Sequence, residues 1–402
     1  MSQIKNTPEI VRISDWIIEQ GILRASLEFL LEGFCERLTE IGFPIMRGYI
    51  SAQTLHPRIA ILGCAWRQNE GIRTDVYVHR TEQSEAYRRS AFKRILDLGV
   101  NDLRVPLHPD QPSEFPVCEE LRPEGAPEYL AQLNTFGRDG VPDGKTGLMS
   151  SWTTARPGGF SDDDIAVLRR LMPRLALAVQ ARLSQDISIN VLDTYVGCEA
   201  GQRILDGEIH RGALDVISAV IFLADLRSFT AISERTPRGE LVDMLNQYFD
   251  CLVAPIVARG GNVLKFLGDG LLATFPLDGR PADRLCEDAL DAAAEVLQQA
   301  AALKAVRIAK GRPVMDLDIA LHLGDVYWGN VGSEERLDFT VIGPAVNETA
   351  RIEALCDQHE RNLLVSETFA KAATRSSARL VSIGRFALRG VRSAQSIFTL
   401  ED

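Results

Sequence analysis

The chain has 402 residues, of which 46% are hydrophobic and 25% are charged, and its formal net charge is −11. This length suggests two folding units, and these proportions are typical of globular proteins, not of disordered or collagen-like ones. The acidic balance argues against nucleic acid as a partner, because binding a phosphate backbone requires a basic surface. The acidic net charge does not exclude small anionic ligands, since a few basic residues or a metal ion can bind them locally.

The seven cysteines are scattered, odd in number and form no Cys-x-x-Cys pair. We therefore expect neither a disulfide framework nor a zinc knuckle, and a reducing compartment fits best. The first 20 residues contain five charged side chains, which a signal-peptide core does not tolerate. The longest apolar run, Val216–Ala224, is about half the length of a membrane span. These features predict a cytoplasmic protein without a membrane span.

The first half of the chain alternates short strand-like and helical patterns. Leucines and other apolar residues at helical spacing predict a helix over 25–41, which Gly42 ends. Short apolar runs predict strands at 59–62, 76–79 and 147–153. The six prolines of 106–127 predict an irregular loop.

A long helix is expected after residue 160. Ser161 and Asp164 have the spacing of a capping box, and apolar residues follow at helical spacing. Pro173 should kink this helix. Residues 183–212 stay polar and helical up to Gly212, which predicts a signalling linker and not a third domain.

The second half has a clearer pattern of strands, helices and one hairpin. Val216–Ala224 reads as a buried strand, and Thr236-Pro237 is a suitable N-cap and first turn for the next helix. The run NVLKFLGDGLLATF predicts two strands around the turn Gly268-Asp269-Gly270. Such interleaving indicates an α/β or α+β fold. The remaining expected elements are a helix at about 283–309, a half-exposed strand at 317–323, a strand at 337–342 and a helix at 345–356.

Two acidic residues are well placed for metal binding. Asp225 closes the buried strand and Asp269 lies at the tip of the hairpin. Mg²⁺ and Mn²⁺ prefer carboxylates together with substrate phosphates. Taken singly, an aspartate at either of these positions more often serves only to form a turn. The segment from Leu226 to Thr230 then leads into a helix, where backbone amides can bind phosphate.

Asn347 and Arg351 are four residues apart, so they project from one face of the expected helix. This pair can orient a hydroxyl group and neutralise a phosphate. The alternative is a solvated helix face on which Arg351 pairs with Glu348 or Glu353.

Three strings in this order and spacing resemble the catalytic domain of class III nucleotidyl cyclases: FLADLRSFT, GGNVLKFLGDGLLATF and LDFTVIGPAVNETARIEAL. The resemblance covers 213–402, and it implies a ferredoxin-like α/β sandwich. It also implies that Asp225, Leu226 and Asp269 bind two Mg²⁺ or Mn²⁺ ions per active site. In the same way, Asn347 resembles the residue that orients the ribose, and Arg351 the one that stabilises the reacting α-phosphate.

The resemblance extends to the substrate. Lys265 and Thr340 stand at the two purine-reading positions, and this Lys/Thr pair implies ATP, because guanylyl cyclases typically have Glu and Cys there. Phe229 and Thr230 match substrate-binding positions, and Arg389 matches a triphosphate-binding lysine.

By this resemblance the protein is an adenylate cyclase that converts ATP to 3′,5′-cyclic AMP and pyrophosphate. The family forms its active sites between two protomers, of which one supplies the metal-binding aspartates and the other the purine-reading and transition-state residues. Every one of these positions is filled in this chain, which implies a homodimer. One alternative is an inactive cyclase-like module for nucleotide binding or dimerisation, which is disfavoured because Asp225, Asp269, Asn347 and Arg351 are all present. Another is a guanylate cyclase.

The first half loosely resembles a GAF-like sensor domain, mainly through 147–183. We therefore expect a GAF-like regulatory domain at 1–182, a helical linker at 183–212 and the catalytic domain at 213–402. The signal could be a small molecule or a protein, and a domain that serves only for dimerisation fits equally well.

Overall fold

The computed structural model describes residues 7–79, 84–108, 111–136, 147–391 and 393–401. The chain divides into two compact units, Met1–Val191 and Leu192–Asp402. Each unit is described by itself. The expected division into 1–182, 183–212 and 213–402 stays a prediction.

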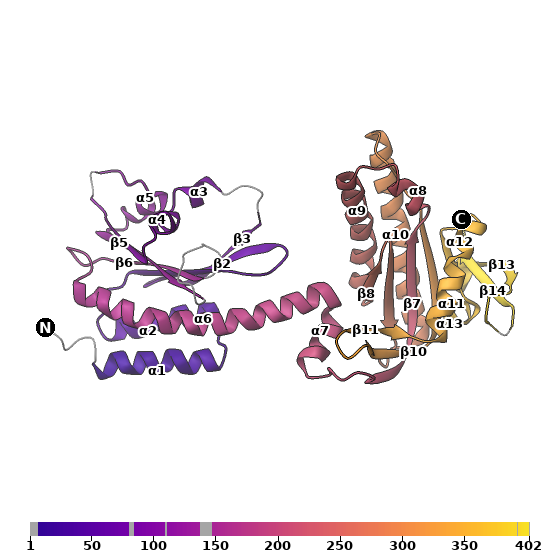
Figure 1. Ribbon diagram of the computed structural model, residues 1–402, viewed down its shortest axis with the longest axis horizontal. Coiled ribbons are helices and arrows are strands. Elements are labelled where there is room, and N and C mark those ends of the chain that lie inside the picture. The colour runs from indigo at the N-terminus through magenta and orange to yellow at the C-terminus, as the bar shows by residue number, and fades with distance from the viewer. Residues whose placement is uncertain (1–6, 80–83, 109–110, 137–146, 392, 402) are drawn as a thin grey trace. The chain divides into compact units, whose positions relative to one another are not determined.

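The first unit contains a six-stranded sheet with helices on both of its faces (Figure 1). The strand order is β3-β2-β1-β6-β5-β4, and every neighbouring pair is antiparallel. The strands are β1 (Arg47–Gln53), β2 (Ile59–Arg67), β3 (Gly71–Val78), β4 (Asp102–Pro106), β5 (Glu128–Thr135) and β6 (Gly147–Thr154). The helices are α1 (Pro8–Ile22), α2 (Leu27–Glu40), α3 (Glu85–Arg88), α4 (Ala91–Leu98), α5 (Pro116–Leu121) and α6 (Asp162–Val196), the last of which continues beyond this unit.

One face of this sheet packs on α1, α2 and α6 around a core that is centred on Trp152. Alternate residues of a strand point to opposite faces, so the even-numbered residues of β1 and β6 supply this core. They include Ile50, Leu148 and Trp152, and Phe34 of α2 meets the Trp152 ring edge-on at 5.6 Å. A smaller cluster packs α4 and α5 on the other side.

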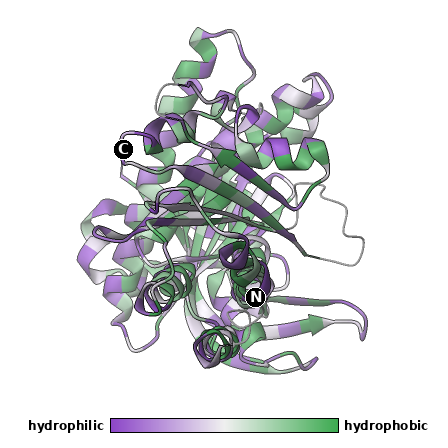
Figure 2. Cartoon of the chain, turned by 90° about the vertical axis from the view of Figure 1, so that its left-hand side faces the viewer, coloured by the Kyte–Doolittle hydropathy of each residue, from purple (hydrophilic) through white to green (hydrophobic). Residues whose placement is uncertain are grey.

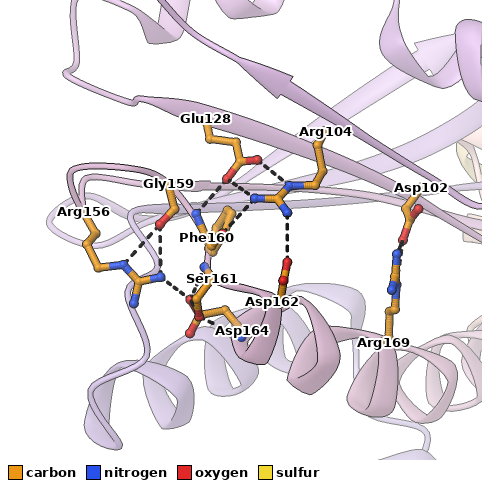
Figure 3. A network of polar contacts seen from close by, with 10 residues as sticks. All are labelled: Asp102, Arg104, Glu128, Arg156, Gly159, Phe160, Ser161, Asp162, Asp164 and Arg169. Carbon is orange, nitrogen blue, oxygen red and sulfur yellow. Dashed lines mark hydrogen bonds and ion pairs between the residues drawn. The ribbon is translucent and has the colours of Figure 1, made fainter. Parts of the chain in front are cut away.

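A polar network fixes the first turn of α6 to the sheet (Figure 3). The expected capping box is confirmed: the Asp164 N–H donates to Ser161 Oγ at 3.2 Å, and the Ser161 N–H donates to Asp164 Oδ2 at 2.7 Å. Buried Glu128 of β5 accepts from Arg104 Nε at 2.6 Å and from the Phe160 N–H at 2.7 Å. The turn that begins α6 is therefore held by both side-chain and backbone groups.

One expectation for this half needs correction. The segment 106–127 is not wholly irregular, because it contains α5, which starts at Pro116. Proline is compatible with the first turn of a helix, where its missing N–H would have no partner. Pro173 lies inside α6, which continues to Val196, and the kink expected there stays a prediction; Gly197, with φ +87°, then separates α6 from α7 (Cys198–Leu205).

The second unit contains an eight-stranded sheet. Seven strands follow the order β13-β14-β12-β10-β7-β9-β8, and β11 pairs with β10. The strands are β7 (Leu214–Leu226), β8 (Asn262–Leu267), β9 (Gly270–Pro276), β10 (Leu317–Gly332), β11 (Leu337–Ile342), β12 (Leu363–Val365), β13 (Leu380–Phe386) and β14 (Gln395–Leu400). The helices are α7, α8 (Phe229–Ser233), α9 (Arg238–Ala258), α10 (Ala282–Ala309), α11 (Pro344–Glu353), α12 (Leu355–Gln358), α13 (Glu367–Ala372) and the 3₁₀ helix η2 (Thr374–Arg379).

The chain order β7-α9-β8-β9-α10-β10 is the βαββαβ pattern of a ferredoxin-like fold. Its four strands lie in the order β10-β7-β9-β8, and each neighbouring pair is antiparallel. The expected α/β fold class is therefore confirmed. Helices α9 and α10 cover one face of this sheet, whereas α11 packs on the other (Figure 1).

Three expectations for the second half are wrong in detail. Thr236 does not cap α9, because its hydroxyl donates to the Ile232 carbonyl at 2.8 Å and Pro237 takes the N-cap position. The strand at 317–323 is not half exposed: Asp318 is only 3% exposed, since helices cover both faces of β10. The helix expected at 345–356 is two helices, α11 and α12.

By length and composition α9 is apolar enough to cross a membrane. Its buried residues Met244, Tyr248, Leu252 and Ile256 belong to the core of the second unit, as in a core helix of a globular domain. Hydropathy colouring shows hydrophobic and hydrophilic residues interspersed along the helices (Figure 2). Such interspersion is expected of helices that bury one side.

Candidate active site

Asp225 and Asp269 are brought together by strand pairing. Asp225 is the penultimate residue of β7, and Asp269 lies in the two-residue turn between β8 and β9. Because Ala224 of β7 pairs with Leu271 of β9, the turn falls beside Asp225. Gly270 makes this approach possible: a Cβ atom there would lie 2.9 Å from Asp225 Oδ1 and 2.8 Å from the Ala224 carbonyl oxygen. Only glycine leaves room for the Asp225 carboxylate here.

The electrostatics of this pair suit a cation. Burial, and next the charge of Asp269, raise the pKa of Asp225 from 3.8 to about 6. A divalent ion would relieve both effects, since it would neutralise the two carboxylates at once. Among the described residues no group of three or more His, Cys, Asp or Glu side chains could hold a metal ion. The donors that meet here are these two carboxylates, which phosphate oxygens and water would complete, and the expected role of the Leu226 carbonyl stays a prediction.

Arg227 fixes the segment that follows Asp225. Its guanidinium binds both carboxylate oxygens of Asp318, with Nε at 2.9 Å from Oδ2. The backbone N–H of Arg227 donates to the Asp316 carbonyl at 2.9 Å. Asp318 is the cross-strand partner of Asp225. Arg227 therefore neutralises the buried Asp318 and orients the chain beside Asp225, a positioning role that the sequence analysis did not identify.

Phe229 and Thr230 start the short helix α8, after Ser228 in the left-handed region at φ +64°. Phe229 packs against the core of the second unit, whereas Thr230 is exposed. Amides in the first turn of a helix lack partners within the helix and so can bind an anion. The expected phosphate-binding turn thus has a suitable backbone.

Lys265 and Thr340 lie on β8 and β11. Lys265 Nζ is 2.5 Å from Oδ2 of Asp338, which precedes Thr340 by two residues and therefore lies on the same side of β11. Thr340 is only 5% exposed, and its Oγ1 has no hydrogen-bond partner among the described residues. The Lys265 ammonium group and the unpartnered Thr340 hydroxyl therefore lie on the same side of β11. Asp338 is a residue that the sequence analysis missed.

Asn347 and Arg351 lie one turn apart on α11, and Arg351 Nη1 donates to the Asn347 carbonyl at 3.3 Å. In the described part of the chain, Arg351 pairs with neither Glu348 nor Glu353, so the solvated-face alternative lacks its expected ion pair. The Arg351 guanidinium instead lies next to Gly390, 3.7 Å from where its Cβ would be. The exposed Arg389 precedes Gly390, so two guanidinium-bearing segments meet at this loop.

Glu353 was also missed. It follows Arg351 by two residues, and burial raises its pKa to about 7, with further contributions from the charges of Asp225, Asp318 and Asp269. The end of α11 is therefore within electrostatic reach of the two candidate metal-binding aspartates. Glu353 lies in the same contiguous motif as Arg351, but its partial burial, which raises its pKa, could not be read from the sequence.

The candidate residues form two groups. No hydrogen bond or ion pair between described residues joins Asp225 or Asp269 to Lys265, Asn347 or Arg351. The first group lies at the Asp225 end of β7, and the second lies on β8, β11 and α11. Within the portion of one chain that the structure describes, the two groups have no direct polar contact.

Residues 215–402 match the family model described as the adenylate and guanylate cyclase catalytic domain. An adenylate cyclase of Anabaena cylindrica is 33% identical over 183 residues, which cover 44% of this chain and 35% of that protein. Adenylate cyclase 1 of Rhizobium meliloti is 32% identical over 145 residues, or 35% of this chain and 21% of that protein. The chain thus spans about a third or less of the length of these relatives.

Among solved structures, the adenylyl cyclase CyaB from P. aeruginosa is 24% identical. The alignment covers 47% of this chain and 96% of that chain, with a TM-score of 0.43.

Proposed function

We propose that residues 215–402 are a class III cyclase catalytic domain and that the protein is an adenylate cyclase, which converts ATP to 3′,5′-cyclic AMP and pyrophosphate. The observation that carries the proposal is the pair Asp225 and Asp269, held side by side against Gly270 at one end of the sheet. A half-buried carboxylate whose pKa is raised by burial and by the charge of a second carboxylate is suited to a divalent cation and a triphosphate.

In this proposal Asp225, Asp269 and the Leu226 carbonyl hold two Mg²⁺ or Mn²⁺ ions. Bound there, the ions would neutralise triphosphate charge and lower the pKa of the ribose 3′-hydroxyl. The amides of Phe229 and Thr230 would bind the phosphates through the start of α8.

The second group of residues would act on the other parts of the substrate. Lys265 and the orphaned Thr340 hydroxyl are a donor and a donor–acceptor that an adenine ring can use. Asn347 would orient the ribose, and Arg351 would stabilise the charge that develops on the α-phosphate during in-line attack of the 3′-hydroxyl. Arg389, in the loop beside Arg351, would bind the departing pyrophosphate.

The active sites are proposed to form between two copies of the chain. The lack of direct polar contact between the two groups of residues supports this arrangement, since each copy would give one group to each site. Exposed apolar side chains also support an interface on the catalytic domain: Phe266 of β8 is 51% exposed and Tyr327 of β10 is 47% exposed.

The first unit is proposed to be a GAF-like regulatory domain of a cytoplasmic enzyme. Its antiparallel sheet and its helix α6, which continues into the second unit, are compatible with a sensor whose last helix leads to an output domain. A change in α6 would then alter how the two catalytic domains meet.

Cyclic nucleotide production by the purified full chain tests this function. The protein is incubated with ATP or GTP and with Mg²⁺ or Mn²⁺, and Asp269→Ala is compared with Asp250→Ala, a matched change at an exposed position on α9. Cyclic AMP that disappears only in Asp269→Ala would support the reaction and the metal role. Cyclic GMP as the main product would reject the assignment of ATP.

Absence of product would be followed by the same assay on residues 213–402. Activity of this fragment would show that the first unit inhibits the enzyme. If neither protein turns over ATP, the chain is an inactive cyclase-like module and the proposal is wrong.

A further inference from the structure

The first unit has a large cleft on the face of its sheet opposite the Trp152 core. Its volume is about 1460 Å³, ample for a small molecule. Odd-numbered residues of β1 and β6 line it, because Tyr49 pairs with Ser151 and Ser51 pairs with Met149 in the sheet register. The cleft is therefore built by the regular strands of the sheet.

Arg47 is the buried charge of this cleft. Its side chain lines the cleft although the residue is only 9% exposed. The guanidinium donates to Ser151 Oγ at 3.2 Å and lies 5.4 Å from the centre of the Tyr49 ring. Among the described residues no carboxylate forms an ion pair with it, so most of its five N–H donors have no protein acceptor.

The surrounding charges do not compensate Arg47. The charged neighbours that act on it are Arg67 and Glu124, and these two pair with each other at 2.5 Å. Tyr49 and Tyr129 are the other titratable groups that act on it, and burial raises the pKa of both, so they stay neutral near pH 7. A buried cation without a counter-charge is unfavourable. An anionic ligand would supply the missing charge.

One part of the cleft offers an apolar surface, while charged side chains such as Glu70, Lys93 and Asp97 line other parts of it. Phe92 of α4 stacks on Tyr49 with ring centres 6.2 Å apart, and Leu133 and Met149 line the same cleft. Aromatic rings and aliphatic side chains of this kind bind the hydrophobic part of a ligand, while a few polar groups fix its orientation.

We propose that this cleft binds a small organic anion, whose carboxylate or phosphate group pairs with Arg47 and whose apolar part lies against Tyr49 and Phe92. The planar guanidinium matches two oxygen atoms of either group. The proposal concerns the first unit alone and does not depend on the cyclase activity proposed above.

Thermal unfolding of the full chain tests the proposal, with sodium benzoate, phenyl phosphate and uncharged benzamide as probes at matched ionic strength. A ligand that binds the folded protein raises the unfolding temperature with its concentration. We expect at least one of the two anions to do so and benzamide not to. The stronger of the two identifies the preferred anionic group.

Two variants assign the effect to Arg47. Arg47→Met should weaken anion binding by roughly tenfold or more, as expected for loss of charge-assisted hydrogen bonds. The matched control is Arg12→Met on α1, whose side chain is 75% exposed, paired with Glu9 and outside the cleft; it should keep the wild-type affinity within about twofold.

Without a probe, Arg47→Met should unfold at or above the wild-type temperature, because it removes an uncompensated charge. If Arg47→Met does not fold, Arg47→Lys replaces it: this variant keeps the charge but not the planar fork, so its affinity should fall measurably. The proposal is overturned if neither anion stabilises the wild type more than benzamide does. It is equally overturned if the anions stabilise wild type and variant alike.

Discussion

Asp225→Asn should stabilise the metal-free protein at pH 7.5, although it removes a proposed metal ligand. Burial and the neighbouring Asp269 raise the pKa of Asp225 from 3.8 to about 6. The ionised carboxylate is therefore less favourable in the folded protein than in the unfolded chain. A difference between 3.8 and about 6 corresponds to about 3 kcal/mol at most. Asp225 is only half-buried, so solvent screening reduces the expected gain to about 1–2 kcal/mol.

The sign of the pH dependence follows from proton binding. Below pH 3.8 Asp225 is protonated in both states, so the substitution has no electrostatic effect. Between pH 3.8 and about 6 the folded protein retains a proton that the unfolded chain has lost, so the free energy of unfolding falls as the pH rises. Above about pH 6 Asp225 is ionised in both states, and the folded protein bears the full cost of holding the ionised carboxylate. Asp225→Asn also removes a charge that raises the pKa of Glu353, which acts in the same direction near neutral pH.

The assay is thermal unfolding in EDTA from pH 4 to pH 8, with Asp250→Asn as the exposed control. The variant should unfold at a higher temperature than the wild type at pH 7.5, and the gap should close by about pH 4. Mg²⁺ together with ATP should stabilise the wild type and not the variant. A lower unfolding temperature at pH 7.5, or a gap that is the same at all pH values, would refute the reasoning.

Three further substitutions test single contacts. Gly270→Ala should destabilise the second unit by about 1–3 kcal/mol and reduce cyclic AMP production, because its Cβ would displace the carboxylate beside it; calorimetry and the activity assay check both effects. Arg227→Met should lower the stability of that unit by about 3–5 kcal/mol, since it strands the buried Asp318, and adding Asp318→Asn should restore much of the loss. Ser161→Ala should destabilise the first unit by about 1 kcal/mol through the capping box with Asp164, whereas Ser161→Thr should be near neutral; equal losses in the two variants would contradict this role.

The local features that the sequence predicts correctly depend on nearest neighbours along the chain. The hairpin turn at Gly268-Asp269 and the capping box at Ser161 are examples, since their geometry involves only a few consecutive residues. Local patterns were misleading where the tertiary structure supplies a partner. Thr236 bonds back to Ile232 instead of capping α9, and residues 317–322 of β10 are buried on both faces by helices that their own alternation does not reveal.

The residue types and order of the candidate site were visible in the sequence, because the motifs around Asp225, Asp269 and Arg351 are contiguous. The environment of these residues was not visible in the sequence. Only strand register brings Asp269 beside Asp225, and only the packing of α11 brings Glu353 within reach of their charges.

The sequence by itself determined the likeness of residues 215–402 to the adenylate and guanylate cyclase catalytic domain, through short motifs whose chemistry depends on residue type and spacing. The tertiary structure decided which charges are compensated. Arg227 is paired with Asp318, whereas Arg47 is buried among tyrosines and a serine with no carboxylate bound to it in the part of the chain that the structure describes. Charge compensation depends on contacts between residues far apart in the chain, about 100 positions in the case of Arg47 and Ser151. Such contacts exist only once the strands have paired.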